Sequence, residues 1–295
     1  MGDSQTTPIM LTVSSLVHPL NKFGRMGHIH SKFQGSFVIQ VKNQLIHFGS
    51  YAHYIAGFGL YLSPEDFNQI NDIIDIGNRV RVTEDELTFY GKKSVQSFAY
   101  KASKVDQRLH AIPFDNKLLS SLLSAYDQAI ASTSRTALGL NTEDNSFQKI
   151  QTMLEQDDNQ VIDWDKIIHY LIGRGRGLTP SGDDMLVGYL AVMKLFALYR
   201  AEDLSDQLLE SPLSTTDVSK AYILAGAEDY FSTPIYQLYT LCKVADLNDL
   251  AQLTINLTDA ITNTMRVGHT SGHDMTFGMG MGLRYVQQAH AKVSK

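Results

Sequence analysis

Two stretches of the sequence place the same polar residues in the same order. Ser181–Gly188 and Ser271–Gly278 share serine, glycine, aspartate, methionine and a second glycine at five of eight aligned positions. Each stretch follows a glycine-containing segment and opens a run of apolar residues typical of a helix. The N-terminus of a helix presents unpaired backbone N–H groups and partial positive charge, which favour a bound anion. The repeated motif therefore predicts a site for a small anionic ligand.

The approach to the first motif adds donors that helix formation alone does not require. Gly173–Gly177 alternates three glycines with Arg174 and Arg176. Glycines let backbone N–H groups converge on a ligand, and guanidinium groups match carboxylate or phosphate with paired hydrogen bonds. The second copy has Arg266 and His269 in the corresponding places. The glycine spacing differs from a dinucleotide fingerprint, and the sequence has no GxxxxGK[ST] phosphate loop.

Each candidate residue has an expected role. We expect His269 to polarise a carbonyl group or exchange a proton, because the pKa of an unperturbed imidazole lies near neutrality. Asp184 and Asp274 would orient the reacting groups or bind an amide NH₂. The expected substrate-binding residues are Arg174, Gly175, Arg176, Gly177, Thr179, Ser181, Gly182, Asp183, Thr270, Ser271 and Gly272.

Helix capping offers a structural explanation for part of the pattern. Ser181 with Asp184, and Ser271 with Asp274, have the serine-to-acid spacing of a capping box before an apolar run. Gly188 and its counterpart in the second copy would then let two helices cross closely. Capping accounts for the serines, the methionines and the later glycines, but not for the glycines and arginines that precede the first helix.

Two further readings involve the same residues. His269, His273 and Asp274, with the aspartates of the first copy, have side chains that bind divalent metals. Ser181, His269 and Asp274 would supply a Ser–His–Asp hydrolase, although no nucleophile-elbow pattern surrounds the serine. The anion site is the preferred interpretation, with no metal and no cofactor expected.

The composition narrows the class of protein. The 295 residues carry a formal net charge of −6, and no basic run exceeds Lys92-Lys93. A basic surface for nucleic acid or anionic membranes is therefore not expected. The single cysteine fits a reducing compartment, and Met1–Met10 lacks the apolar core of a signal peptide. We expect a cytoplasmic protein with no membrane span.

The periodicity of apolar residues changes near residue 113, which predicts two domains. An α+β chain is expected, with a β-rich, barrel- or sandwich-like domain at 1–112 and a mostly α-helical domain at 113–295. The expected β elements are a hairpin of Phe37–Val41 with Leu45–Phe48, a hairpin of Arg79–Val82 with Leu87–Tyr90, and shorter pieces at Ile9–Val13 and Val95–Tyr100. The expected helices begin at Ser63-Pro64 and at Leu118, and near 146–156, 161–171, 182–200, 216–230, 235–244, 247–264 and 272–292.

These residues resemble a known family, AllH. The resemblance lies in Gly175–Asp184 followed by an apolar helix, and then in Gly268–Asp274. It extends over most of the chain in length and in the order of β-rich and helical parts. The name-giving member is a subunit of an oxamate carbamoyltransferase of anaerobic allantoin breakdown. The resemblance therefore implies a role in moving a carbamoyl group within purine nitrogen catabolism.

The implied reaction links oxalurate and phosphate with oxamate and carbamoyl phosphate. The implied partner is an FdrA-type subunit that resembles acyl-CoA synthetases. Carbamoyl phosphate and oxamate are small, planar anions, so they suit the expected donors. The resemblance does not say which subunit holds the chemistry. A non-catalytic scaffold subunit, whose motifs only shape an interface, and a metal-dependent hydrolase of a small amide or phosphate remain as alternatives.

Overall fold

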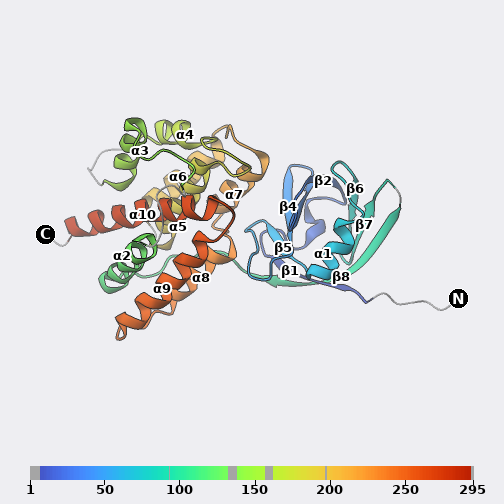
Figure 1. The fold of residues 1–295 in the computed structure, drawn as a ribbon, viewed down its shortest axis with the longest axis horizontal. Coiled ribbons are helices and arrows are strands. Elements are labelled where there is room, and N and C mark those ends of the chain that lie inside the picture. Colours follow the sequence, from blue (N-terminus) through green and yellow to red (C-terminus); the bar gives the residue numbers. More distant parts are fainter. Residues whose placement is uncertain (1–6, 93, 132–137, 157–161, 197, 294–295) are drawn as a thin grey trace. The chain divides into compact units, whose positions relative to one another are not determined.

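The computed structural model describes residues 7–92, 94–131, 138–156, 162–196 and 198–293. The chain divides into two compact units, Met1–Gln107 and Arg108–Lys295. The first unit is built from strands and the second from helices (Figure 1). The α+β class predicted from the periodicity is therefore confirmed.

The first unit is a closed, mixed β-barrel. Strands β1 and β8 pair in parallel and close the sheet, so the barrel alternative holds rather than the sandwich. Both predicted hairpins are present, as β3 with β4 and β6 with β7. Around the barrel the order is β1 (Ile9–Ser14), β5 (Gly59–Tyr61), β4 (Gln44–Gly49), β3 (Ser36–Val41), β2 (Met26–Lys32), β6 (Arg79–Val82), β7 (Glu86–Tyr90) and β8 (Val95–Val105).

Aromatic side chains fill the barrel interior. Phe37 and Phe48, which are cross-strand neighbours, stack with ring centroids 4.7 Å apart, and Phe89 meets Phe37 edge to face. Phe67 adds a fourth ring from helix α1 (Pro64–Asn71). That helix begins as predicted, because the Ser63 hydroxyl accepts a hydrogen bond from the backbone N–H of Asp66 at 3.1 Å.

Strand β2 escaped prediction because its residues lack an apolar alternation. The segment contains Gly27, His28 and His30, which have weak strand preference by themselves. Pairing with β3 and β6 on both sides supplies the hydrogen bonds that fix the strand. At Gly27 a Cβ atom would stand 2.4 Å from the carbonyl oxygen of Gln40, so only glycine fits this approach.

The second unit is a helical domain arranged around α5. Every residue of α5 except Lys194 is buried, which explains why its apolar residues show no single face. In the described residues the helices are α2 (Asn116–Ala131), α3 (Asn145–Glu155), α4 (Trp164–Leu171), α5 (Ser181–Leu195), α6 (Tyr199–Glu210), α7 (Asp217–Ala227), α8 (Thr233–Lys243), α9 (Leu250–Met265) and α10 (Ser271–Val293). No described helix has the length and apolar character needed to cross a membrane.

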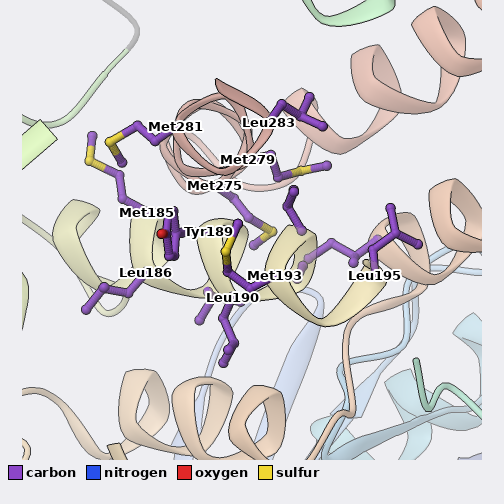
Figure 2. Close-up of a cluster of buried hydrophobic side chains, with 14 of the residues drawn as sticks. Met185, Leu186, Tyr189, Leu190, Met193, Leu195, Met275, Met279, Met281 and Leu283 are labelled. Atoms are coloured by element: carbon purple, nitrogen blue, oxygen red, sulfur yellow. The ribbon is translucent and has the colours of Figure 1, made fainter. Parts of the chain in front are cut away.

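Helices α5 and α10 cross at a pair of glycines. A Cβ at Gly188 would stand 1.9 Å from the carbonyl oxygen of Met275, and one at Gly278 would stand 1.9 Å from that of Met185. Each helix backbone therefore rests on the other. Around this crossing, Met193 from α5 and Met279 from α10 are among the buried side chains of one cluster (Figure 2). The prediction of close helix crossing is confirmed.

Helix α6 was not predicted, and the expected helix at 182–200 is wrong at its C-terminal end. Helix α5 ends at Leu195, and α6 begins at Tyr199. The second residue of α6, Arg200, is only 2% exposed and donates to the carbonyl oxygens of Leu154 and Gln156 at the end of α3, at 3.1 and 3.0 Å. A guanidinium there complements the negative end of the α3 dipole. Tertiary packing of this kind leaves no periodic signal.

We expect Gly188→Ala to lower the free energy of unfolding by ~1–3 kcal/mol, because the added methyl group would overlap the α10 backbone. An alanine in an unobstructed helix interior normally stabilises by up to ~1 kcal/mol. Gly226→Ala in α7 is the matched control, since its Cβ would contact only side-chain atoms, the nearest 3.3 Å away. Urea unfolding measures both. A Gly188→Ala protein as stable as the parent would contradict the crossing.

Candidate active site

The beginnings of α5 and α10 meet. The hydroxyl oxygens of Thr179, just before α5, and Ser271, the first residue of α10, lie 2.7 Å apart. The two copies of the motif, far apart in the sequence, thus form one cluster. Backbone N–H groups at both helix N-termini contribute partial positive charge to the same region.

Each motif supplies hydroxyl groups to the carboxyl of the other. Asp184, in α5, is faced by the hydroxyls of Ser271 and Thr179. Asp274, in α10, is faced in turn by the hydroxyl of Ser181. The serine of each copy therefore lies beside the aspartate of the other copy. This gives the cluster an approximate two-fold arrangement that follows from the repeat.

Both carboxyl groups are removed from water. Asp184 is 4% exposed and Asp274 is fully buried. Burial raises the pKa of Asp184 well above its ordinary value of 3.8, and the nearby charge of Asp274 raises it further. Burial also raises the pKa of Asp274, although the Gly139 N–H donates to this carboxyl at 3.0 Å and favours its charged form. The hydroxyl groups around both carboxyls act in the same direction as that N–H.

Several buried oxygens of the cluster have no hydrogen-bond partner among the described residues. They are Ser181 Oγ, Asp184 Oδ2 and Asp274 Oδ2. Buried polar atoms without partners are uncommon, and a ligand is one explanation for them. A Cβ at Gly139 would stand 2.0 Å from Ser181 Oγ and 3.2 Å from Asp274 Oδ2, so the backbone of Gly139 packs against both oxygens. Sequence reasoning missed Gly139, because no motif surrounds it.

The loop before α5 turns three times into the left-handed region. Gly173, Gly175 and Gly177 have φ angles of 72°, 128° and 90°. Alternation of this kind turns successive N–H groups toward a common side and forms an anion-binding concavity. From Gly175 to Thr179 the backbone N–H groups have no acceptor in the described part of the chain. These φ angles are compatible with the predicted convergence of donors, which stays a prediction.

The two arginines of this loop differ. Arg174 Nε donates to the carbonyl oxygen of Tyr170 at 2.6 Å, and its guanidinium lies 4.0 Å from the centre of the Tyr170 ring. Arg176 is exposed and makes no hydrogen bond, ion pair or ring contact with the described residues. Of the two side chains, Arg176 is therefore the one available to a ligand.

Asp183 holds the loop in place. Its Oδ1 accepts from the N–H of Gly173 at 2.7 Å, and its Oδ2 accepts from the hydroxyls of Ser219, at 2.6 Å, and Thr215. Burial raises the pKa of Asp183, while these donors lower it. Both carboxylate oxygens are used within the protein, in contrast to Asp184 and Asp274. The roles of Ser219 and Thr215 could not be read from the sequence.

The motif glycines Gly182 and Gly272 serve close packing. A Cβ at Gly182 would meet the carbonyl oxygen of Leu171 at 2.0 Å. The N–H of Gly182 donates to the backbone carbonyl oxygen of Arg174 at 2.9 Å. The N–H of Gly272 likewise donates to Val267 at 2.9 Å. These two N–H groups are therefore engaged within the loops, unlike those of residues 175–179.

The loop before α10 is shorter than the loop before α5. Gly268 has a φ of 64°, and His269 is exposed beside it. Thr270 is partly buried and faces the carboxyl of Asp274. The side chain of Arg266 donates to the Asn263 side chain at 3.1 Å. His269 and Arg176 are thus exposed members of the predicted set, as is Arg174, whose guanidinium is engaged with Tyr170.

The expected capping by Ser181 is wrong. The N-cap of α5 is Pro180, and Ser181 makes no capping hydrogen bond. The Pro180 carbonyl accepts from the N–H groups of Asp183 and Asp184, at 2.9 and 3.2 Å, which closes the first turn without a side chain. The serine hydroxyl is thereby free to face Asp274.

The described residues do not form the ligand set of a metal site or the triad of a hydrolase. Among these residues no three His, Cys, Asp or Glu side chains come close enough to hold one metal ion. Ser181 faces Asp274 directly, which is not the serine–imidazole–carboxylate order of a hydrolase. A separate apolar cavity lies between α2 and the C-terminal half of α5, and its lining includes Leu122, Val192, Leu238, Ile261, Met279 and Leu283. Its apolar lining does not suit an anion.

Comparison with known proteins identifies the segment that carries both motifs. A family model described as oxamate carbamoyltransferase subunit AllH matches residues 171–283. No solved structure matches the chain significantly. The matched segment runs from the end of α4 into α10 and includes Asp183, Asp184, Ser271 and Asp274. The resemblance inferred from the two motifs is confirmed over these residues, which lie in the helical unit.

Proposed function

We propose that this chain is a subunit of a carbamoyltransferase and binds a small carbamoyl-bearing anion where α5 and α10 begin. The observation that carries the proposal is the meeting of two helix N-termini around buried oxygens that have no hydrogen-bond partner among the described residues. The family description, which names an oxamate carbamoyltransferase subunit, supports the choice of ligand. Oxamate and carbamoyl phosphate each combine an anionic group with an amide NH₂.

The anionic group would bind the glycine–arginine loop. Its donors are the free N–H groups of residues 175–179 and the unengaged guanidinium of Arg176. Charge-assisted hydrogen bonds of this type are stronger than neutral ones, particularly next to a helix N-terminus. Thr179 and Ser271 would position ligand oxygens from the junction between the motifs.

The transfer step requires little covalent participation by the protein. A phosphate oxygen attacks the carbamoyl carbon of oxalurate, the C–N bond breaks, and the oxamate nitrogen takes up a proton. His269, exposed at the rim of the cluster, would exchange this proton or polarise the carbonyl. The convergent N–H groups would stabilise the developing oxyanion. An FdrA-type, acyl-CoA-synthetase-like subunit is the proposed partner in the complete enzyme.

The scaffold alternative accounts for one observation, the backbone contact at Gly188 and Gly278. It gives no reason to keep Ser181 Oγ and Asp184 Oδ2 buried without partners. A protein that binds neither oxamate nor carbamoyl phosphate in isolation, yet co-purifies with a synthetase-like subunit, would favour the scaffold.

We expect Arg176→Ala and His269→Ala each to weaken oxamate or carbamoyl phosphate binding by about tenfold or more, as for lost hydrogen bonds to charged groups. Both side chains are exposed, so the melting temperature should change little. Calorimetric titration and thermal unfolding measure the two effects. Arg79→Ala, an exposed arginine of the barrel, is the control for charge. Folded variants with unchanged affinity would refute these assignments.

Asp183→Asn should act on stability before it acts on binding. An amide cannot accept hydrogen bonds at both ends, so one of the donors Gly173, Thr215 and Ser219 would lose its acceptor. The expected loss is ~1–3 kcal/mol in urea unfolding. Asp203→Asn, on the exposed face of α6, is the matched control and should be neutral. Equal stability of the two variants would argue against the positioning role.

The buried carboxyl of Asp184 should make stability fall as pH rises. Its pKa is raised in the folded protein, so the folded state binds more protons than the unfolded state above pH 3.8. Stability therefore declines from that pH until the folded pKa is passed. The loss is about 1.4 kcal/mol for each pKa unit of difference. Asp184→Asn should remove this decline and be the more stable protein at neutral pH. Urea unfolding across pH, with Asp203→Asn as control, tests this, and parallel profiles would contradict it.

A further inference from the structure

The cluster has two layers with opposite hydrogen-bonding character. The outer layer is the loop of residues 175–179, whose free backbone groups are N–H donors. The inner layer holds Asp184 Oδ2, Asp274 Oδ2 and Ser181 Oγ, which are buried and unpaired. The unprotonated oxygens of a carboxyl and the oxygen of a hydroxyl accept hydrogen bonds. A ligand that satisfies both layers needs an anionic end and a donor end.

We propose that Asp184 and Asp274 select the amide end of the ligand, so that the site takes oxamate and rejects its isosteric dicarboxylate, oxalate. This inference rests on the proposed function and assigns the specificity of that same site. Oxamate and oxalate have nearly the same size and planarity. They differ in that an NH₂ group of one is replaced by a negatively charged oxygen in the other.

The burial of the two aspartates makes this difference count. With 4% and 0% exposure, these carboxyls have little water to screen them from a second negative charge. An oxalate oxygen placed against them would bring no donor to Asp184 Oδ2 or Asp274 Oδ2, and it would be repelled by each carboxyl that is ionised. The NH₂ of oxamate has two N–H donors and carries no charge. Sites built around a specific donor discriminate well against ligands that lack it, because buried polar groups are then left unpaired.

Ser181 adds an observation independent of the acidic residues. Its hydroxyl is 1% exposed, has no hydrogen-bond partner among the described residues, and packs with Asp274 Oδ2 against the backbone of Gly139. This hydroxyl faces Asp274, which can accept its proton, while the serine oxygen itself receives no donor from the described residues. A donor from a ligand would satisfy this oxygen together with the carboxyl oxygen beside it.

The experiment compares oxamate and oxalate by calorimetric titration of the full chain. The parent protein should bind oxamate ~10- to 100-fold more tightly than oxalate. Asp274→Asn and Asp184→Asn place an amide donor where an acceptor stood, so each should shift the affinity ratio toward oxalate by at least about tenfold. Both substitutions keep the size of the side chain. Asp203→Asn is the control and should leave the ratio unchanged.

The outcomes separate this inference from the proposed function. If both ligands bind equally well to the parent and to the asparagine variants, the selection by the carboxyls is refuted while the anion site stands. If inorganic phosphate binds but oxamate does not, the amide selection also fails. If none of the three ligands binds to the folded parent, the proposed function fails and this inference with it. Thermal unfolding of each variant verifies that a changed ratio comes from a folded protein.

Discussion

The backbone contact between α5 and α10 is the constraint on which the candidate site depends. Gly188 lies seven residues after Ser181, and Gly278 lies seven residues after Ser271. At a rise of about 1.5 Å per residue, both helices therefore begin about 10 Å from their crossing point. Two helices that touch at glycines, start equally far from the contact and run in the same general direction bring their N-termini to the same region, as the contact between Thr179 and Ser271 shows. The repeat thus fixes the meeting of its own polar residues.

The cluster at these N-termini is maintained at a cost to the free protein. Burial disfavours ionised Asp184 and Asp274, and the N–H and hydroxyl groups around them only partly offset this effect. Asp183 shows that the same fold can satisfy a buried carboxylate fully when it uses Gly173 and Ser219. The contrast is informative, because the carboxyl oxygens without partners lie where the two motifs meet. The satisfied carboxylate of Asp183 instead contacts the start of the loop before α5 and helix α7. Unsatisfied polar groups often concentrate at functional sites for this reason.

Sequence patterns predicted the features that depend on local periodicity. The two hairpins, the start of α1 at Ser63 and most helices follow from apolar spacing and cap residues. Sequence patterns failed where contacts with distant parts of the chain decide which secondary structure forms. Strand β2 gains its order from its neighbours on both sides, and α6 is fixed partly by the buried Arg200.

The candidate site shows the same limit at the level of single residues. The motif spacing indicated that two helix starts carry the site, and Thr179 does contact Ser271. The serine-to-acid spacing suggested capping at α5, but a carbonyl at Pro180 closes that turn and leaves Ser181 for another role. Gly139 comes from a distant segment and has no pattern of its own. Its contribution depends on how close its backbone lies to Asp274, which no local pattern records.

The inner residues of the cluster are nearly symmetric, whereas the two loops around them differ. This difference bears on how a ligand is oriented. The inner residues exchange almost equivalently, with Ser181 toward Asp274 and Ser271 toward Asp184. An inner layer of this kind would by itself hold a short planar ligand in either of two directions. The outer layer breaks this equivalence, because the loop before α5 carries Arg176 and free N–H groups, whereas the loop before α10 is shorter and presents His269. Under the proposed function, the anionic end therefore faces Arg176, and the amide end faces the buried carboxyls of Asp184 and Asp274.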